Sequence, residues 1–97
     1  MEPATEKALA IIAAYLHAGE AIRRGSERDG EQLLTVFNDL VREASDGNEE
    51  VGRTIAALTD VALGAFRVLA ERSGQDPLEY FRRFAEQTAL DEDTDTS

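Results

Sequence analysis

Several residue types are scarce or missing in this chain of 97 residues. It has no cysteine and no tryptophan, two prolines and a single histidine, His17. The lack of cysteine excludes disulfide bonds, thiolate metal sites and cysteine nucleophiles. Long helices are permitted because proline, which interrupts them, is rare. The longest apolar run, ALAIIAAYL at 8–16, is far shorter than the roughly 20 residues that span a bilayer, so we expect no membrane contact.

Basic residues are also scarce relative to acids. The chain has 10 Lys and Arg residues and 20 Asp and Glu residues, which gives a formal net charge of -10 and a sequence pI near 4.4. Such a chain is repelled by phosphate backbones and anionic membranes, so we expect a partner protein with a basic or apolar surface and no nucleic acid. The opening segment MEPATEK lacks the features of a signal peptide, which predicts a cytoplasmic protein.

Glycine-containing segments divide the chain into four parts. The separating segments are RRGSERDGE, SDGNEE and RSGQDP. Between them, apolar residues recur at intervals of three and four residues. This spacing predicts helices at about 3–24, 30–45, 49–73 and 77–90. The short connections favour antiparallel neighbours, and we expect an all-α antiparallel four-helix bundle that forms one domain over 1–90. The acidic segment 91–97 is predicted to be a disordered tail.

Two of the predicted helices carry more apolar or small side chains than one buried face requires. In the helix at 49–73 the apolar arc covers roughly 220°. On the helix at 3–24, the face opposite the predicted core holds Ala10, Ala13, Ala14, His17 and Ala21. Small side chains let a second helix approach closely, so these five residues are our candidate interface for a homodimer, built through either helix or both. The alternative is that alanine is simply a good exposed helix former.

The residue pattern offers no catalytic constellation. The segment HAGE at 17–20 reverses the Glu-x-x-His order of di-iron bundles and has no second copy. Ser26, Ser45 and Ser73 all lie at predicted helix ends, where serine serves as a cap or turn residue. There is no glycine-rich phosphate loop. We therefore expect neither an enzyme nor a cofactor, and we interpret His17 as an exposed or interface residue.

Three hypotheses about function follow. The first is a small acidic all-α interaction or regulatory module that forms a homodimer and binds another protein. The second is a nucleic-acid-associated regulator, or a DNA mimic, that uses Arg23, Arg24 and Arg28 around the first turn. These arginines lie near acids, and a solvated surface explains them more simply. The third is a helical bundle that binds a metal or a small molecule.

Overall fold

The computed structural model describes residues 2–95 of the chain, and for 92–95 it describes the backbone only. Four helices account for nearly all of this part: α1 (Pro3–Arg23), α2 (Glu27–Ser45), α3 (Glu49–Ser73) and α4 (Pro77–Asp95). Residues 2–95 contain no strand. The prediction of an all-α fold with four helices is confirmed.

Local chemistry explains where α3 begins and ends and where α4 begins. The Asn48 side chain accepts a hydrogen bond of 3.1 Å from the backbone N–H of Val51 and so caps α3. Gly74 follows α3 with a φ of 67°, a left-handed conformation that glycine adopts without strain. At the start of α4, Asp76 accepts a bond of 3.1 Å from the N–H of Leu78. The predicted bounds of α3 are therefore confirmed, as is the predicted start of α4.

Two other boundaries differ from the prediction. α2 begins at Glu27, three residues before the predicted start at 30. Gly30 thus lies inside the helix, where it is buried, and a Cβ at this position would collide with the Ile22 side chain. Glycine here allows α1 and α2 to approach closely. α4 continues to Asp95, so most of the segment predicted to be a disordered tail is helical; 96–97 lie outside the described residues.

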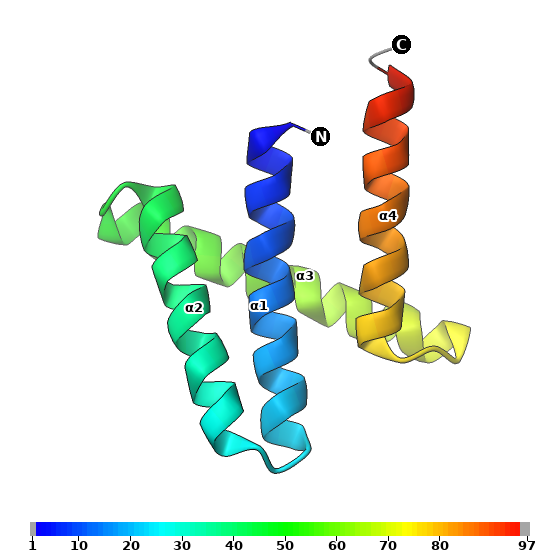
Figure 1. The fold of residues 1–97 in the computed structure, drawn as a ribbon, viewed down its shortest axis with the longest axis horizontal. Helices are drawn as coiled ribbons and strands as arrows, with labels where there is room; N and C mark the ends of the chain where they lie inside the picture. Colours follow the sequence, from blue (N-terminus) through cyan, green and yellow to red (C-terminus); the bar gives the residue numbers. More distant parts are fainter. Residues whose placement is uncertain (1, 96–97) are drawn as a thin grey trace.

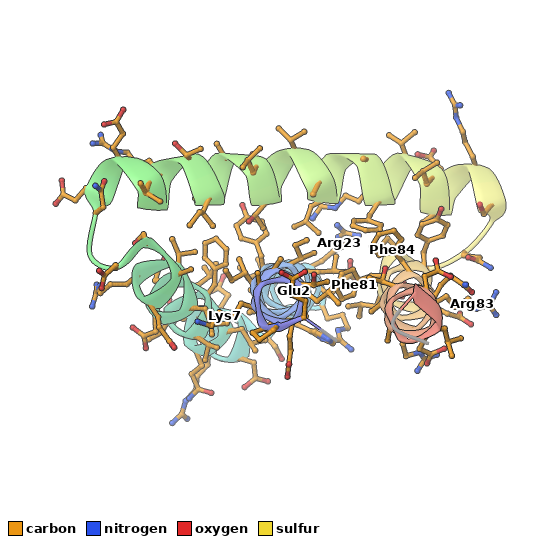
Figure 2. All side chains as sticks on the ribbon, turned by 90° about the horizontal axis from the view of Figure 1, so that it is seen from above. Glu2, Lys7, Arg23, Phe81, Arg83 and Phe84 are labelled. Atoms are coloured by element: carbon orange, nitrogen blue, oxygen red, sulfur yellow. The ribbon has the colours of Figure 1, made fainter. Side chains whose placement is uncertain are left out.

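The helices form two layers instead of an up-down-up-down bundle. α2 and α4 flank α1 and run antiparallel to it, and α3 lies across all three (Figure 1). Seen from above, α1, α2 and α4 stand in a row on one side of α3 (Figure 2). The antiparallel prediction thus holds for α1, α2 and α4 and is wrong for α3. A short connection limits the distance between helix ends, but it leaves their crossing angle free.

The layered arrangement is thin and open. Its extents are 42 × 37 × 19 Å, and its radius of gyration is 14.1 Å. A compact chain of this length has a radius of gyration of about 12.5 Å. Because α3 alone forms the second layer, the other helices of the chain cover only one of its faces.

The core consists of two clusters on either side of α1. The first joins α1, α2 and α3; its buried members are Ile11, Ala14, Phe37 and Val41. The second joins α1, α3 and α4; its buried members are Leu16, Leu63, Phe66 and Phe81. α1 and α3 contribute to both clusters, so these two helices connect α2 with α4.

Candidate functional site

The five residues of the predicted interface on α1 do not share one exposed face. Ala14 and Ala21 are buried, Ala13 is partly buried, and Ala10 and His17 are exposed. Ala14 packs in the same cluster as Phe37 and Val41 of α2. The small residues do admit a close neighbour, but for Ala14 that neighbour is α2 of the same chain. In this fold Ala14 and Ala21 are not accessible to a second chain, while the homodimer itself stays a prediction.

His17 borders a groove between α1 and α4. The other lining residues come from the start of α4: Asp76, Leu78, Glu79, Phe81, Arg82 and Ala85. The acids of this groove already have partners, because Asp76 caps α4 and Glu79 lies 3.3 Å from Nη2 of Arg83. Within the described residues, no group of three or more His, Cys, Asp or Glu side chains could hold a metal ion.

The three arginines of the nucleic-acid hypothesis lie around the turn between α1 and α2. Arg23 Nη1 is 3.2 Å from Oε1 of Glu20, and Arg24 Nε donates a bond of 3.3 Å to the Glu20 backbone oxygen. The Arg23 contact is an ion pair without hydrogen-bond alignment, since Oε1 of the buried Glu20 has no hydrogen-bond partner among the described residues. Arg28 is exposed at the start of α2. Two of the three guanidinium groups are therefore turned back onto α1.

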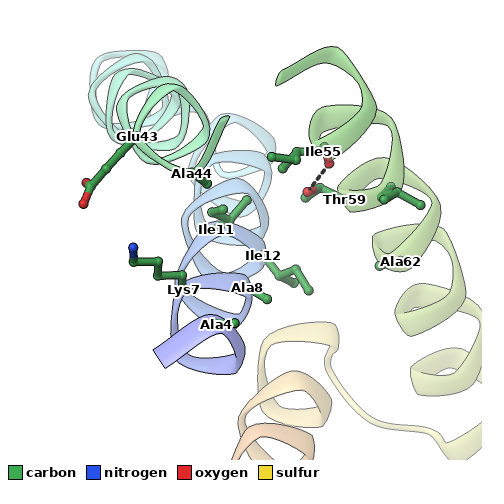
Figure 3. A pocket seen from close by; sticks show the side chains of 11 residues that line it. Ala4, Lys7, Ala8, Ile11, Ile12, Glu43, Ala44, Ile55, Thr59 and Ala62 are labelled. Atoms are coloured by element: carbon green, nitrogen blue, oxygen red, sulfur yellow. Dashed lines mark hydrogen bonds between the residues drawn. The ribbon is translucent and has the colours of Figure 1, made fainter. Parts of the chain in front are cut away.

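An apolar cleft of about 500 Å³ lies between α1, α2 and α3 (Figure 3). Its lining residues are Ala4, Lys7, Ala8, Ile11, Ile12, Glu43, Ala44, Ile55, Leu58, Thr59 and Ala62. Lys7 and Glu43 extend on the side away from α3 (Figure 3). The Thr59 hydroxyl donates a bond of 2.8 Å to the Ile55 backbone oxygen and is thereby satisfied within α3. The walls are thus mainly methyl and methylene groups, which suit an apolar occupant. Sequence reasoning missed this cleft because residues from three helices form it.

A second apolar surface runs along α3 on the side away from the other helices, and it shares Leu58 at its edge with the cleft. We define the outer face of α3 as Thr54, Ala57, Leu58, Val61, Gly64, Ala65 and Val68, all of which are exposed. Val61 is 72% and Leu58 63% exposed. Figure 2 shows side chains along this edge pointing away from the row of α1, α2 and α4. The broad apolar arc predicted for this helix was the sequence signal for this face.

No protein-family model, no curated protein and no solved structure matches this chain. None of the helices in the part of the chain that the structure describes is both long enough and apolar enough to cross a bilayer. What the structure defines is a class, an all-α fold of four helices in two layers with an apolar cleft and an open helix face.

Proposed function

We propose that this protein is a small acidic interaction module that self-associates and binds another protein at the cleft between α1, α2 and α3. The observation that carries this proposal is the cleft itself, a concave apolar surface of about 500 Å³. Exposed apolar surface of this kind, rimmed by charged residues such as Lys7 and Glu43, is characteristic of interaction sites.

An amphipathic helix with basic flanking residues fits the cleft best. Its apolar side chains would fill the space beside Ile12 and Ile55, as in other helix-in-groove complexes. Its basic residues would be attracted by the net charge of -10. The charge supports fast encounter, while apolar burial supplies most of the affinity.

Affinity capture from the native host lysate with two matched variants tests this proposal. Ala8 is exposed and lines the cleft, so Ala8→Arg fills it without removing a core side chain. Asn38→Arg on the exposed side of α2 adds the same charge elsewhere and is the control. We expect a protein that the wild type and Asn38→Arg both retain and that Ala8→Arg loses by at least about tenfold. Equal capture by all three proteins would contradict binding at the cleft.

The volume of the cleft also favours a second candidate function, the binding of a small apolar molecule. Ligand pockets are typically about 300–1,000 Å³ with predominantly apolar walls. An environment-sensitive apolar dye tests this candidate, with fluorescence that should rise on the wild type and on Asn38→Arg but not on Ala8→Arg. Dye binding without any captured protein would favour the small-molecule function over the first proposal.

A further inference from the structure

The outer face of α3 has a regular seven-residue spacing. Thr54, Val61 and Val68 follow one another at intervals of seven, and Ala57 and Gly64 do the same. This is the spacing of the apolar seam along which two helices pair in a coiled coil. All five residues are exposed, and the seam from Thr54 to Val68 covers about 21 Å of α3, which is about 37 Å long.

The same face is nearly symmetric about Val61. Thr54 and Val68 lie seven residues to either side of it, and Ala57 and Ala65 lie four to either side. The remaining pair, three residues to either side, combines the large Leu58 with Gly64. A Cβ at Gly64 would meet nothing within 4 Å, so there is open space outside this position.

We propose that a second copy of this chain covers the outer face of α3, with the two α3 helices antiparallel and a two-fold axis close to Val61. A two-fold interface brings residue i of one copy to residue j of the other and j to i. Two-fold symmetry about Val61 therefore places Leu58 of each copy opposite Gly64 of the other, so a large side chain meets a gap. The inference rests on the self-association in the proposed function and specifies its surface and direction.

The charges at the ends of the face select the antiparallel direction. Glu50 and Arg72 are both exposed, and each lies eleven residues from Val61. In the antiparallel pair, Glu50 of each copy comes opposite Arg72 of the other, at both ends of the seam. A parallel pair would bring Glu50 to Glu50 and Arg72 to Arg72, which is repulsive. Between these ends the outer face carries no charge, which matters because two copies with a net charge of -10 repel one another elsewhere.

Sedimentation velocity of the full chain over a concentration series is the first test. We expect the wild type to sediment as a dimer of the 10.6 kDa chain at micromolar concentration. Val61→Glu should raise the dimer dissociation constant at least about 100-fold, because it places two carboxylates at the centre of an apolar seam. Asn38→Glu, an equal charge change on α2, should leave that constant within about twofold. Circular dichroism checks that every variant stays helical.

Exchanging the charges at the ends of the outer face tests whether the two α3 helices are antiparallel. Glu50→Arg and Arg72→Glu should each weaken the dimer severalfold, and the double variant should recover most of the loss. A double variant weaker than both single variants would overturn the antiparallel register.

Disulfide trapping gives an independent readout because the chain has no cysteine of its own. Val61→Cys should form an intermolecular disulfide rapidly at low protein concentration, since the two-fold axis brings both copies of residue 61 together. Val36→Cys is the matched control, because Val36 is also exposed but lies on α2. Equal rates for the two variants would overturn the proposal.

The outcomes separate this inference from the function on which it rests. A wild-type monomer at 10.6 kDa would overturn both the self-association and the α3 interface. A wild-type dimer that Val61→Glu leaves intact would overturn the α3 interface alone. In either case, binding of another protein at the cleft is decided separately by the Ala8→Arg comparison.

Discussion

The two faces of α3 are both apolar, and only one of them is covered. On the inner face Leu63 is 1% exposed, whereas Leu58, five residues earlier on the same helix, is 63% exposed. The inner face meets α1, α2 and α4, while the described part of the chain has no element to place on the outer face (Figure 2). The exposed apolar face of α3 supports the proposed self-association, and the contrast between the two faces can be measured.

The largest expected effect comes from truncating the same residue type on each face. Leu63→Ala should lower the free energy of unfolding by about 3 kcal/mol, since it removes a fully buried side chain and leaves a cavity. Leu58→Ala should lower it by less than about 1 kcal/mol in the monomer, because that side chain is largely hydrated already. Urea unfolding followed by circular dichroism, at low protein concentration, measures both. Equal losses would mean that the two faces are covered to the same extent.

An intermediate effect is expected from the aromatic cluster that holds α4 against the inner face. The Phe66 ring lies edge-on to Phe84 at 5.0 Å, to Phe81 at 5.5 Å and to Tyr80 at 6.1 Å between centroids. Phe66→Leu keeps an apolar side chain but loses these contacts, so we expect a loss of about 1.5 kcal/mol.

Hydrogen exchange shows which helices are destabilised by Phe66→Leu. Amides of α4 should exchange faster than in the wild type, while those of α2 change less. Phe37→Leu in the other cluster is the matched control and should speed exchange in α2 instead, because Phe37 packs edge-on to Tyr15 at 4.8 Å. Uniform acceleration in all four helices would show that the clusters open as one unit.

The smallest effect is expected at the polar edge between the two faces, where the Tyr15 hydroxyl donates a bond of 3.3 Å to Asp60 of α3. Burial raises the pKa of Tyr15 above its ordinary value of 10.0, and the Asp60 charge and this hydrogen bond raise it further, against the opposing effect of Arg67. The folded state then binds the phenol proton more tightly than the unfolded state. Its contribution to stability is complete below pH 10 and is lost as the pH rises through the folded pKa.

Titration of the tyrosinate absorbance measures this shift. Asp60→Asn should lower the pKa of Tyr15 part of the way back towards 10.0, because burial, the larger cause, remains. The Tyr15→Phe variant lacks this phenol, so the titration step that it loses is the one that belongs to Tyr15. An unchanged titration in Asp60→Asn would show that Asp60 does not act on the phenol.

The sequence predicted the helices well and their arrangement only in part. Caps such as Asn48 and Asp76 act within a few residues, so the bounds of α3 and the start of α4 could be read directly. The predicted start of α2 at 30 was three residues late, because Gly30 belongs to the helix, where its lack of a side chain leaves room for Ile22. The crossing of α3 depends on how side chains of separate helices interlock, which the loop lengths do not specify.

The same distinction applies to the candidate surfaces. For the small residues of α1, periodicity does not tell an intramolecular neighbour from a second chain, and α2 occupies the position beside Ala14. The surplus apolar arc of α3 did indicate an open face. The cleft could not be predicted from the sequence, because Ala8, Ala44 and Ile55 belong to three different helices and come together only when these helices pack.

By itself the sequence determined the acidic charge, the four helices and the surplus of apolar surface, because these follow from composition and from contacts within a few residues. Tertiary structure alone decided that α3 lies across the other three helices, that the small residue Ala14 is buried against α2, and that no helix of the same chain covers the outer face of α3. The physical reason is that burial depends on which helices meet, and a helix packs against only as many neighbours as the fold brings to its faces.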